Sequence, residues 1–252
     1  MPLKHQKFFS TNSALYASAR PHYPEPLFKF LASLCPDLNR AWDCGTGSGQ
    51  AAITMAKYFQ EIEASDVSPE QISNALMKKR VNYSVQHAEA TNFANDSFSL
   101  VTVAQALHWF DLQKFWPEVQ RVLKPQGVFA AWAYSWFRIS EEIDSVIKEK
   151  LLDKIEAYWA PQNHLAWNGY QTISFPFNEI KPPPIAFTQE WNLDQLLSYL
   201  GTWSATGNYI EAQGDDWFKK LAETLKIVWG NHQATRTITM DFYLRIGRHE
   251  IR

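Results

Sequence analysis

Residues 41–49, Ala-Trp-Asp-Cys-Gly-Thr-Gly-Ser-Gly, combine an acid with three glycines at alternate positions. Glycine allows the backbone to take φ > 0, or to approach a ligand with no Cβ in the way. A short apolar run precedes this loop and the apolar-rich segment 51–58 follows it, which predicts a strand, a tight turn and a helix. The free N–H groups at the start of that helix face the same space. We expect the loop to hold a ligand through Asp43, Gly45, Thr46, Gly47 and Gly49.

Two other interpretations of this loop stay open. One is a glycine-rich turn between strand and helix that binds nothing. The other is a dinucleotide site, in which the pattern G-x-G-x-x-G brings a third glycine against the helix that holds the pyrophosphate. Counted from Gly45, that third glycine would be residue 50, which is Gln50. The spacing therefore fits a dinucleotide less well.

Apolar runs after this loop predict strands at 61–67, 81–86, 98–106 and 128–134, and helical spacing predicts helices from Ser68 and over 115–123. Strands that alternate with helices are typical of a parallel sheet covered by helices, with right-handed crossovers. Further along, we expect a helix over 141–158, a loop or lid over 160–187, and a strand near 186–191. Helices over 194–200 and 215–228 and a strand over 235–246 complete the expected elements.

The second predicted strand ends in an acid, Asp66, which is followed by Val67 and by a helix start, Ser68-Pro69. Asp66 comes about 20 positions after Gly45, the separation at which such folds place an acid against ribose hydroxyls. A strand-end aspartate is also a common helix cap. Ser68 is available for that capping role, so we interpret Asp66 as a ribose ligand and Val67 as its neighbour in the site.

The loop resembles the first motif of the class I S-adenosylmethionine-dependent methyltransferases, with G-x-G-x-G two residues after an acid. Residues 86–98 are similar to that family's G-D-A-E-x-L-P-F-x-D-x-S-F-D segment, which implies that His87, Ala88 and Glu89 lie along the adenine. Here His87 replaces the usual acid and Asn92 the usual proline. The departure puts the side-chain contact at residue 87 in doubt and leaves the backbone N–H of Ala88 as a partner for the ring.

Two further segments extend the resemblance over residues 16 to about 134. Residues 104–110, Ala-Gln-Ala-Leu-His-Trp-Phe, match the family's A-Q-A-x-H-W-F, which implies that Ala104, Gln105 and Ala106 lie beside the transferring methyl. Residues 16–24 resemble the Y-x-x-x-R-P-x-Y-P leader of a subgroup that includes trans-aconitate methyltransferases. In that subgroup the leader caps the site, which implies that Tyr16 and Arg20 contact the methionine moiety.

With this resemblance, we expect an α/β, Rossmann-like, doubly wound and mostly parallel sheet of seven strands, with a C-terminal antiparallel strand and a helical lid or insert. A single methyltransferase domain is expected over 1–252. Its parts are an N-terminal cap (1–40), a cofactor-binding core (41–135), a variable acceptor or lid region (136–214), and a final helix and strand (215–252).

The resemblance implies methyl transfer from S-adenosyl-L-methionine to a small molecule, with S-adenosyl-L-homocysteine as product and a carboxylate among the acceptors considered. His108 is the candidate general base or orienting donor, and its alternative is a structural histidine bonded to backbone. Candidate acceptor residues are Trp109, Tyr134, Trp136 and Arg138. Two other functions stay open, a non-catalytic S-adenosylmethionine or S-adenosylhomocysteine binder and a nicotinamide-dependent oxidoreductase.

Composition narrows the partners. The net charge is -2, so no global field favours nucleic acid or an anionic membrane. The one compact basic cluster, Lys78-Lys79-Arg80, is interpreted as the solvated end of a helix. Two cysteines give no metal spacing and no disulfide framework, and no signal peptide or bilayer-length apolar run is found. We expect a cytoplasmic protein without a metal.

Overall fold

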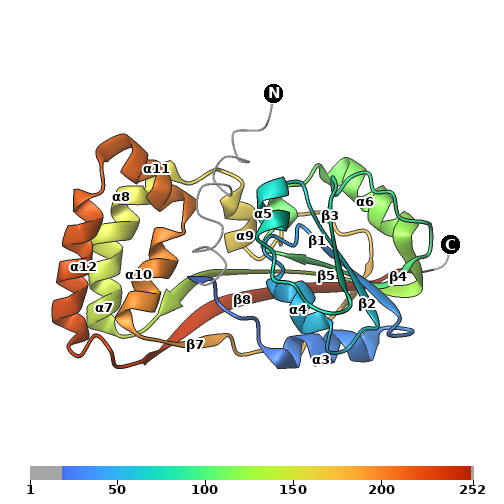
Figure 1. The fold of residues 1–252 in the computed structure, drawn as a ribbon, viewed down its shortest axis with the longest axis horizontal. Helices are drawn as coiled ribbons and strands as arrows, with labels where there is room; N and C mark the ends of the chain where they lie inside the picture. Colours follow the sequence, from blue (N-terminus) through green and yellow to red (C-terminus); the bar gives the residue numbers. More distant parts are fainter. Residues whose placement is uncertain (1–18, 251–252) are drawn as a thin grey trace. The chain divides into compact units, whose positions relative to one another are not determined.

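The computed structural model describes residues 19–250, which divide into two compact units (Figure 1). The sheet unit comprises residues 23–135, 164–186 and 242–250. The helical unit comprises residues 19–22, 136–163 and 187–241. Strands β5 and β8 contribute residues to both units. The expected domain limits stay a prediction.

Eight strands form one sheet in the order β3-β2-β1-β4-β5-β8-β6, and β7 also pairs with β8. Their bounds are β1 Arg40–Cys44, β2 Glu61–Asp66, β3 Val81–Val85, β4 Phe98–Ala104, β5 Leu123–Arg138, β6 Asn178–Ile180, β7 Thr188–Trp191 and β8 Arg236–Arg248. The expected seven strands are all present, and β6 is the addition. Its three residues, Asn-Glu-Ile, are too few to carry a hydrophobic period, so the pairing with β8 decides it.

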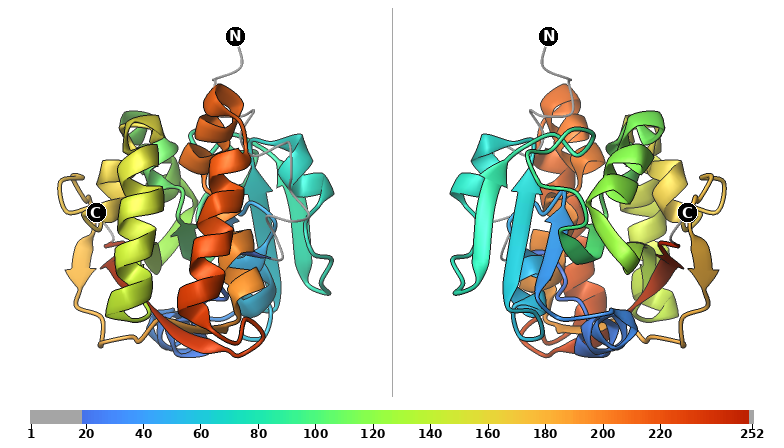
Figure 2. Two further views of the ribbon diagram at one scale, coloured as in Figure 1. Left: turned by 90° about the vertical axis from the view of Figure 1, so that its left-hand side faces the viewer. Right: turned by 90° about the vertical axis from the view of Figure 1, so that its right-hand side faces the viewer.

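Strand order reverses between β1 and β4, and this position locates the site. Strand β1 pairs in parallel with β2 and with β4, and the pairs β2–β3 and β4–β5 are also parallel. Strands β6 and β7 run antiparallel to β8, which confirms the mostly parallel sheet with an antiparallel C-terminal strand. In the right panel of Figure 2, β3, β2 and β1 follow one another from the teal edge of the sheet. Where the order reverses, the loops after β1 and β4 diverge and leave room for a ligand.

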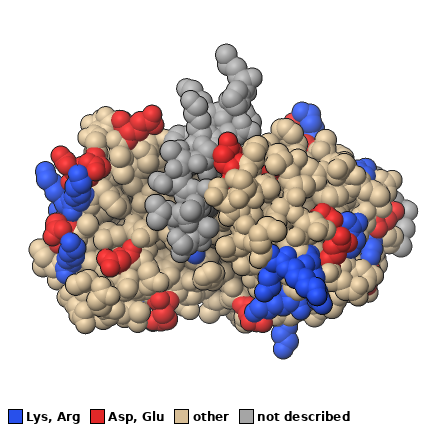
Figure 3. All heavy atoms as spheres, in the orientation of Figure 1, with Lys and Arg blue, Asp and Glu red and all other residues tan. Residues whose placement is uncertain are grey.

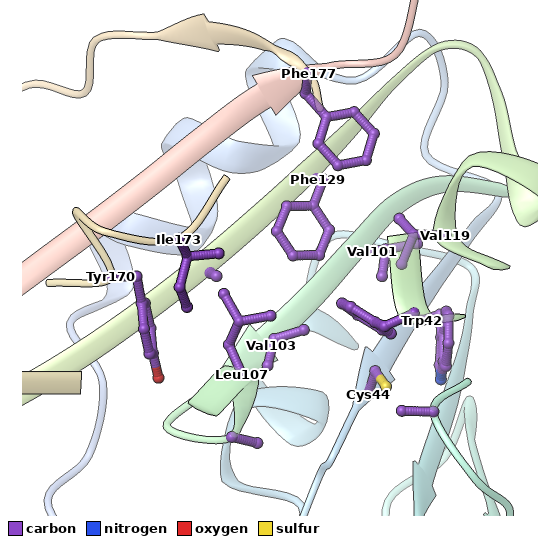
Figure 4. Packing of buried hydrophobic residues seen from close by; sticks show 14 of the residues in the cluster. Trp42, Cys44, Val101, Val103, Leu107, Val119, Phe129, Tyr170, Ile173 and Phe177 are labelled. Carbon is purple, nitrogen blue, oxygen red and sulfur yellow. The ribbon is translucent and has the colours of Figure 1, made fainter. Parts of the chain in front are cut away.

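Helices cover both faces of the sheet unit. They are α3 Glu25–Leu34, α4 Gln50–Met55, α5 Pro69–Ser73, α6 Leu112–Val122 and α9 Asn163–Trp167. Because side chains alternate along a strand, Ala41 and Leu100 pack in one buried cluster with α3 and α4, while Trp42 and Val101 pack in the other with α6. Figure 4 shows this second cluster, in which Phe129 and Phe177 extend the core toward β8.

The helical unit contains α7 Glu141–Ile147, a π-helical turn Lys148–Leu152, α8 Asp153–Ile155, a 3₁₀ turn Glu156–Tyr158, α10 Leu193–Gly201, α11 Ser204–Gln213 and α12 Asp216–Trp229. Helix α12 lies beside α7 in Figures 1 and 2. Its buried residues Leu221, Leu225 and Trp229 recur at the spacing of one helix face. Helix α10 begins with a capping box between Asn192 and Gln195.

Four local expectations differ from the structure. Helix α11 was not expected, because Ser204–Gln213 has few apolar residues and only a weak helical period. The segment 160–187 was expected as a loop or lid, but it contains α9 and β6. The fifth strand extends well beyond the expected 128–134. The cluster Lys78-Lys79-Arg80 does not end a helix, since α5 stops at Ser73 and the cluster leads directly into β3.

Charges of both signs are distributed over the visible surface, with one compact group of basic side chains at the lower right of Figure 3. Over residues 19–250, no helix has the combined length and apolar character needed to cross a bilayer.

Candidate active site at the carboxyl ends of β1, β2 and β4

The glycine loop after β1 has a backbone that only glycine adopts without strain. Gly45, Gly47 and Gly49 have φ values of 68°, 55° and 88°. A Cβ on Gly45 would lie 2.7 Å from the Cβ of Ala106, and one on Gly49 would lie 3.0 Å from Cζ of Tyr83. Among the described residues, the nearest atom to a Cβ on Gly47 would be Gln71 Oε1, at 3.8 Å. Gly45 and Gly49 thus permit close packing, whereas Gly47 leaves open space.

Asp43 ties this loop to the neighbouring strand. Its side chain is fully buried and accepts hydrogen bonds from Thr46 Oγ1 at 2.6 Å and from Thr102 Oγ1 at 2.9 Å. Burial raises the pKa of Asp43 to about 6, against the lowering effect of those two bonds. As a cofactor-binding residue Asp43 stays a prediction. Its buried position favours an indirect role, in which it fixes the position of Thr46 in the loop.

Asp66, at the end of β2, lies against the loop. Its two carboxylate oxygens each accept one backbone bond at 2.9 Å, from the N–H of Gly47 and from the N–H of Ser68. Burial raises the pKa of Asp66, while these backbone donors lower it. The Ser68 side chain caps α5, as expected. The backbone of Val67 is a third donor to this carboxylate. Since an ionised carboxylate has about four acceptor positions, Asp66 retains capacity for at least one ligand hydroxyl.

The segment 86–95, which follows β3, is anchored to α6 by a network that the sequence did not indicate. Glu118 on α6 accepts bonds from the backbone N–H and the hydroxyl of Thr91, and Arg121 binds the same carboxylate at 2.7 Å. Within the segment, His87 is exposed and pairs with Ala90, and Ala88 is buried. The spacing of Glu118 and Arg121 on one helix face was the available signal, but it did not indicate the loop as their target.

Glu89 connects this segment to the turn after β4. Its Oε1 accepts a bond from the backbone N–H of Asp111 at 2.9 Å. Val67, after Asp66, is 37% exposed, so it remains accessible at the end of β2.

The chain after β4 turns sharply at Gln105. This residue takes φ 56°, a left-handed conformation that is uncommon outside glycine, and its side chain donates to the Tyr134 carbonyl at 2.8 Å. Its backbone N–H donates to the Trp132 carbonyl. The turn places Ala106 against Gly45. Ala106 therefore lies directly beside the glycine loop, and the expected position of Ala104–Ala106 beside the transferring methyl stays a prediction.

His108 follows in a 3₁₀ turn, Leu107–Trp109, and is almost completely buried. Its Nδ1 lies 3.2 Å from the hydroxyl of Tyr170, and the Trp109 ring lies 4.6 Å from its ring centroid. Burial lowers the pKa of His108 to about 3. The imidazole is therefore neutral at physiological pH and a weak base. Tyr170 comes from the segment 160–187, inside the expected acceptor or lid region 136–214, but no motif in the sequence indicates this residue.

Five predicted site residues remain, and they lie in different parts of the chain. Tyr16 lies outside the described residues. Tyr134 belongs to the sheet unit, with its ring 6.4 Å from that of Tyr23. The other three belong to the helical unit: Arg20 donates to the Thr202 carbonyl at 3.3 Å, Trp136 packs on Trp203, and Arg138 forms an ion pair with Asp241 at 2.6 Å. Their roles in cofactor or acceptor binding stay predictions.

Comparisons with known proteins decide the family. A model of the methyltransferase domain matches residues 42–131. A putative methyltransferase of Dictyostelium discoideum is 32% identical over 228 residues, which are 89% of this chain and 87% of that protein. The chain belongs to the class I S-adenosylmethionine-dependent methyltransferases. Its cofactor is therefore S-adenosylmethionine, and the oxidoreductase interpretation of the glycine loop is excluded.

Solved structures agree with this assignment of the methyltransferase. The structure of a putative type II methyltransferase from Anaeromyxobacter dehalogenans has a TM-score of 0.85 and 37% identity, and covers 92% of this chain and 99% of its own. A phosphoethanolamine N-methyltransferase of Haemonchus contortus shares the fold at 16% identity and a TM-score of 0.50, with 99% of this chain and 61% of that chain covered. It was solved with S-adenosylhomocysteine and phosphomonomethylethanolamine.

Neutral His108 gives the methyltransferase a testable pH dependence of stability. Because the pKa of about 3 in the folded protein lies below the ordinary 6.5, the unfolded chain takes up the proton first. The stability contributed by the neutral form is present above about pH 6.5 and is lost as the pH falls toward 3. Between pH 6 and pH 4, the wild type should lose about 1.4 kcal/mol of unfolding free energy per pH unit more than His108→Asn does.

Urea unfolding of both proteins at several pH values measures this difference. Asp43 acts in the opposite direction, since its raised pKa stabilises the folded state as the pH falls. It is present in both proteins and cancels in the comparison. Parallel stability curves for wild type and His108→Asn would contradict the prediction.

Proposed function

We propose that this methyltransferase methylates an oxygen of a small molecule, with a carboxylate as the preferred acceptor. The observation that carries this proposal is the state of His108, which is buried, neutral and bonded to Tyr170, and which follows Ala106, the residue against Gly45, by two positions. A hydroxyl, phenol or protonated amine would need a base within hydrogen-bond reach, whereas a carboxylate arrives already deprotonated. Two carboxylates are bonded to the loop: Asp43 is fully buried and Asp66 is partly buried, and both are engaged within the protein.

The residues of the loop fit the cofactor. Gly47 leaves the space that a Cβ would occupy, and Asp66 lies beside it with acceptor positions for ribose hydroxyls. We assign the adenine side to His87, Ala88 and Glu89, with Val67 next to Asp66, and the methionine side to Gly45, Thr46, Gly49 and Ala104–Ala106. Tyr16 and Arg20 are proposed to cap the methionine end. When bound, the cofactor supplies a methyl group on a sulfonium, and displacement by the acceptor oxygen leaves S-adenosylhomocysteine and a methyl ester.

The protein's own contribution is to bind and orient. Asp43 holds Thr46 in the loop by a hydrogen bond, and alignment of bound reactants supplies rate acceleration without proton transfer. His108 is proposed to donate a hydrogen bond to an oxygen of the molecule that receives the methyl group. Trp109, Tyr134, Trp136 and Arg138 are proposed to line the acceptor side, and Arg138 would have to exchange its pairing with Asp241 to bind an acid.

The same proposal covers partners and location. The chain has a net charge of -2, which supports a small-molecule acceptor in place of nucleic acid. Both cysteines, Cys35 and Cys44, are free thiols, which supports a cytoplasmic location. Among the described residues, no group of three or more His, Cys, Asp or Glu side chains could hold a metal ion.

Two measurements test the function in sequence. Saturation with S-adenosylhomocysteine at 100 times its Kd should raise the unfolding free energy by about 2.7 kcal/mol. Protein incubated with S-adenosylmethionine labelled in the methyl group should then transfer label to aliphatic mono-, di- or tricarboxylic acids, and not to the matching primary amides. A methyl ester is identified because alkali releases its label as methanol. Label found only in alkali-stable products of amines or phenols would refute the carboxylate proposal.

A further inference from the structure

Tyr170 combines full burial with an uncommon backbone conformation. It is fully buried and follows Gly169, and the two residues have φ values of 60° and 67°. Non-glycine residues rarely adopt this backbone unless the surrounding structure holds them there. Arg245 on β8 provides that support, since its guanidinium donates to the carbonyls of Tyr170 and Ile173, both at 2.8 Å. The same guanidinium lies over the ring of Phe175 at 4.3 Å from its centroid.

The phenol of Tyr170 lies at the turn after β4. Figure 4 shows Tyr170 beside Leu107, with its hydroxyl at the end nearer that turn. The hydroxyl lies 3.2 Å from Nδ1 of His108, and the backbone of Leu107 also bonds to it. The two rings lie nearly parallel, with an interplanar angle of 26°. The A-Q-A-x-H-W-F motif includes His108 but does not indicate Tyr170 as its partner.

The direction of the bond follows from the groups present. A buried phenol keeps its proton, since burial raises the pKa of Tyr170, and that O–H needs an acceptor. Within residues 19–250, the only side chain that the structure bonds to this hydroxyl is His108, while the Leu107 N–H can only donate. The O–H of Tyr170 must therefore donate to Nδ1. A neutral imidazole that accepts at Nδ1 carries its proton at Nε2.

We infer that Tyr170 is a positioning residue for methyl transfer, which fixes His108 as the Nε2–H tautomer and so makes it a hydrogen-bond donor to an oxygen of the methyl acceptor. The tautomer assignment stands on the Tyr170 contact alone, and the use of Nε2–H toward an acceptor oxygen rests on the proposed function. Among the described residues, His108 makes one hydrogen bond, at Nδ1, so Nε2 is not engaged by them. A fixed donor suits a carboxylate or carbonyl oxygen and disfavours an amine, whose lone pair it would occupy.

Nitrogen NMR of protein labelled with ¹⁵N in the histidine rings reports the tautomer directly. The His108 signals are assigned by their loss in His108→Asn. We expect wild type at pH 7 to show a protonated Nε2 and an unprotonated Nδ1, with the Nε2–H form favoured by about tenfold or more. In Tyr170→Phe that preference should fall by about tenfold, because Nδ1 loses its donor. Tyr58→Phe is the matched control, since it removes a hydroxyl bonded to exposed Glu25 and should leave the His108 signals unchanged.

Two results would overturn the inference: a protonated Nδ1 in wild type, or an unchanged Nε2–H pattern in folded Tyr170→Phe. If Tyr170→Phe does not fold, the wild-type spectrum still decides the tautomer. S-adenosylhomocysteine binding should stay within about threefold of wild type in Tyr170→Phe, as the hydroxyl is bonded to His108 and Leu107. A larger loss of binding would also count against the assigned role. The proposed function fails on separate evidence, the absence of cofactor binding or of methyl esters.

Discussion

Asp66→Asn should weaken the binding of S-adenosylhomocysteine by about 100-fold. The substitution keeps the size of the side chain but removes the charge and replaces one acceptor oxygen with a donor. Gly47 and Ser68 already present two N–H groups to this carboxylate, so the amide would face one of them with its own N–H. Hydrogen bonds to a charged group are worth about 1.5–3 kcal/mol each, and at least one to the ribose would be lost.

Calorimetric titration at pH 8 measures this loss, because an alkaline pH favours the ionised form of a carboxyl whose pKa is raised by burial. Asp96→Asn is the matched control, because Asp96 is exposed and its left-handed backbone, φ 52°, is one that asparagine tolerates. It should bind as wild type does. Thermal unfolding without ligand checks that Asp66→Asn is folded. Equal Kd values for Asp66→Asn and wild type would rule out Asp66 as a ribose ligand.

Gly49→Ala should mainly lower the stability of the protein, whereas Gly47→Ala should mainly weaken cofactor binding. Gly49→Ala adds a Cβ 3.0 Å from Cζ of Tyr83 at φ 88°, and the strained backbone together with overpacking should lower the unfolding free energy by about 3 kcal/mol. Within residues 19–250, the new Cβ of Gly47→Ala meets Gln71 Oε1 alone, at 3.8 Å. It should cost about 1 kcal/mol of stability but project a methyl group into the cofactor space, and weaken cofactor binding by more than about tenfold.

Denaturant unfolding and cofactor titration of both variants separate the two effects. The m-value should not change, so that a shift in the midpoint reports stability. Adding Tyr83→Ala to Gly49→Ala should cost less than the sum of the two single substitutions, because the residue that the new Cβ meets is then removed. If Gly47→Ala binds the cofactor normally, or if the two losses at Gly49 and Tyr83 are additive, the assignment of the two glycines is wrong.

Local spacing explains why much of the core could be predicted. Six of the seven expected strands lie within a few residues of their observed ends, because apolar runs and breakers are properties of neighbouring residues. The fifth strand was predicted too short. The segment Lys124–Gly127 reads as a break, yet β5 begins at Leu123, since pairing with β4 continues through an irregular register there. Helix α11 and strand β6 have weak or short patterns, and their neighbours in the structure decide them.

The sequence by itself determined the family, the glycine loop and the strand-end acid Asp66, because each depends on residue types at fixed short separations. The tertiary structure decided how those residues are held. Thr102 reaches Asp43, Glu118 reaches Thr91, and Tyr170 reaches His108, across separations of 59, 27 and 62 residues. No local period relates such positions, since they meet only when the strands take their order and the segment after α9 packs on the sheet unit. The chemistry available at His108 follows from that packing, because burial keeps its ring neutral and the Tyr170 hydroxyl contacts Nδ1.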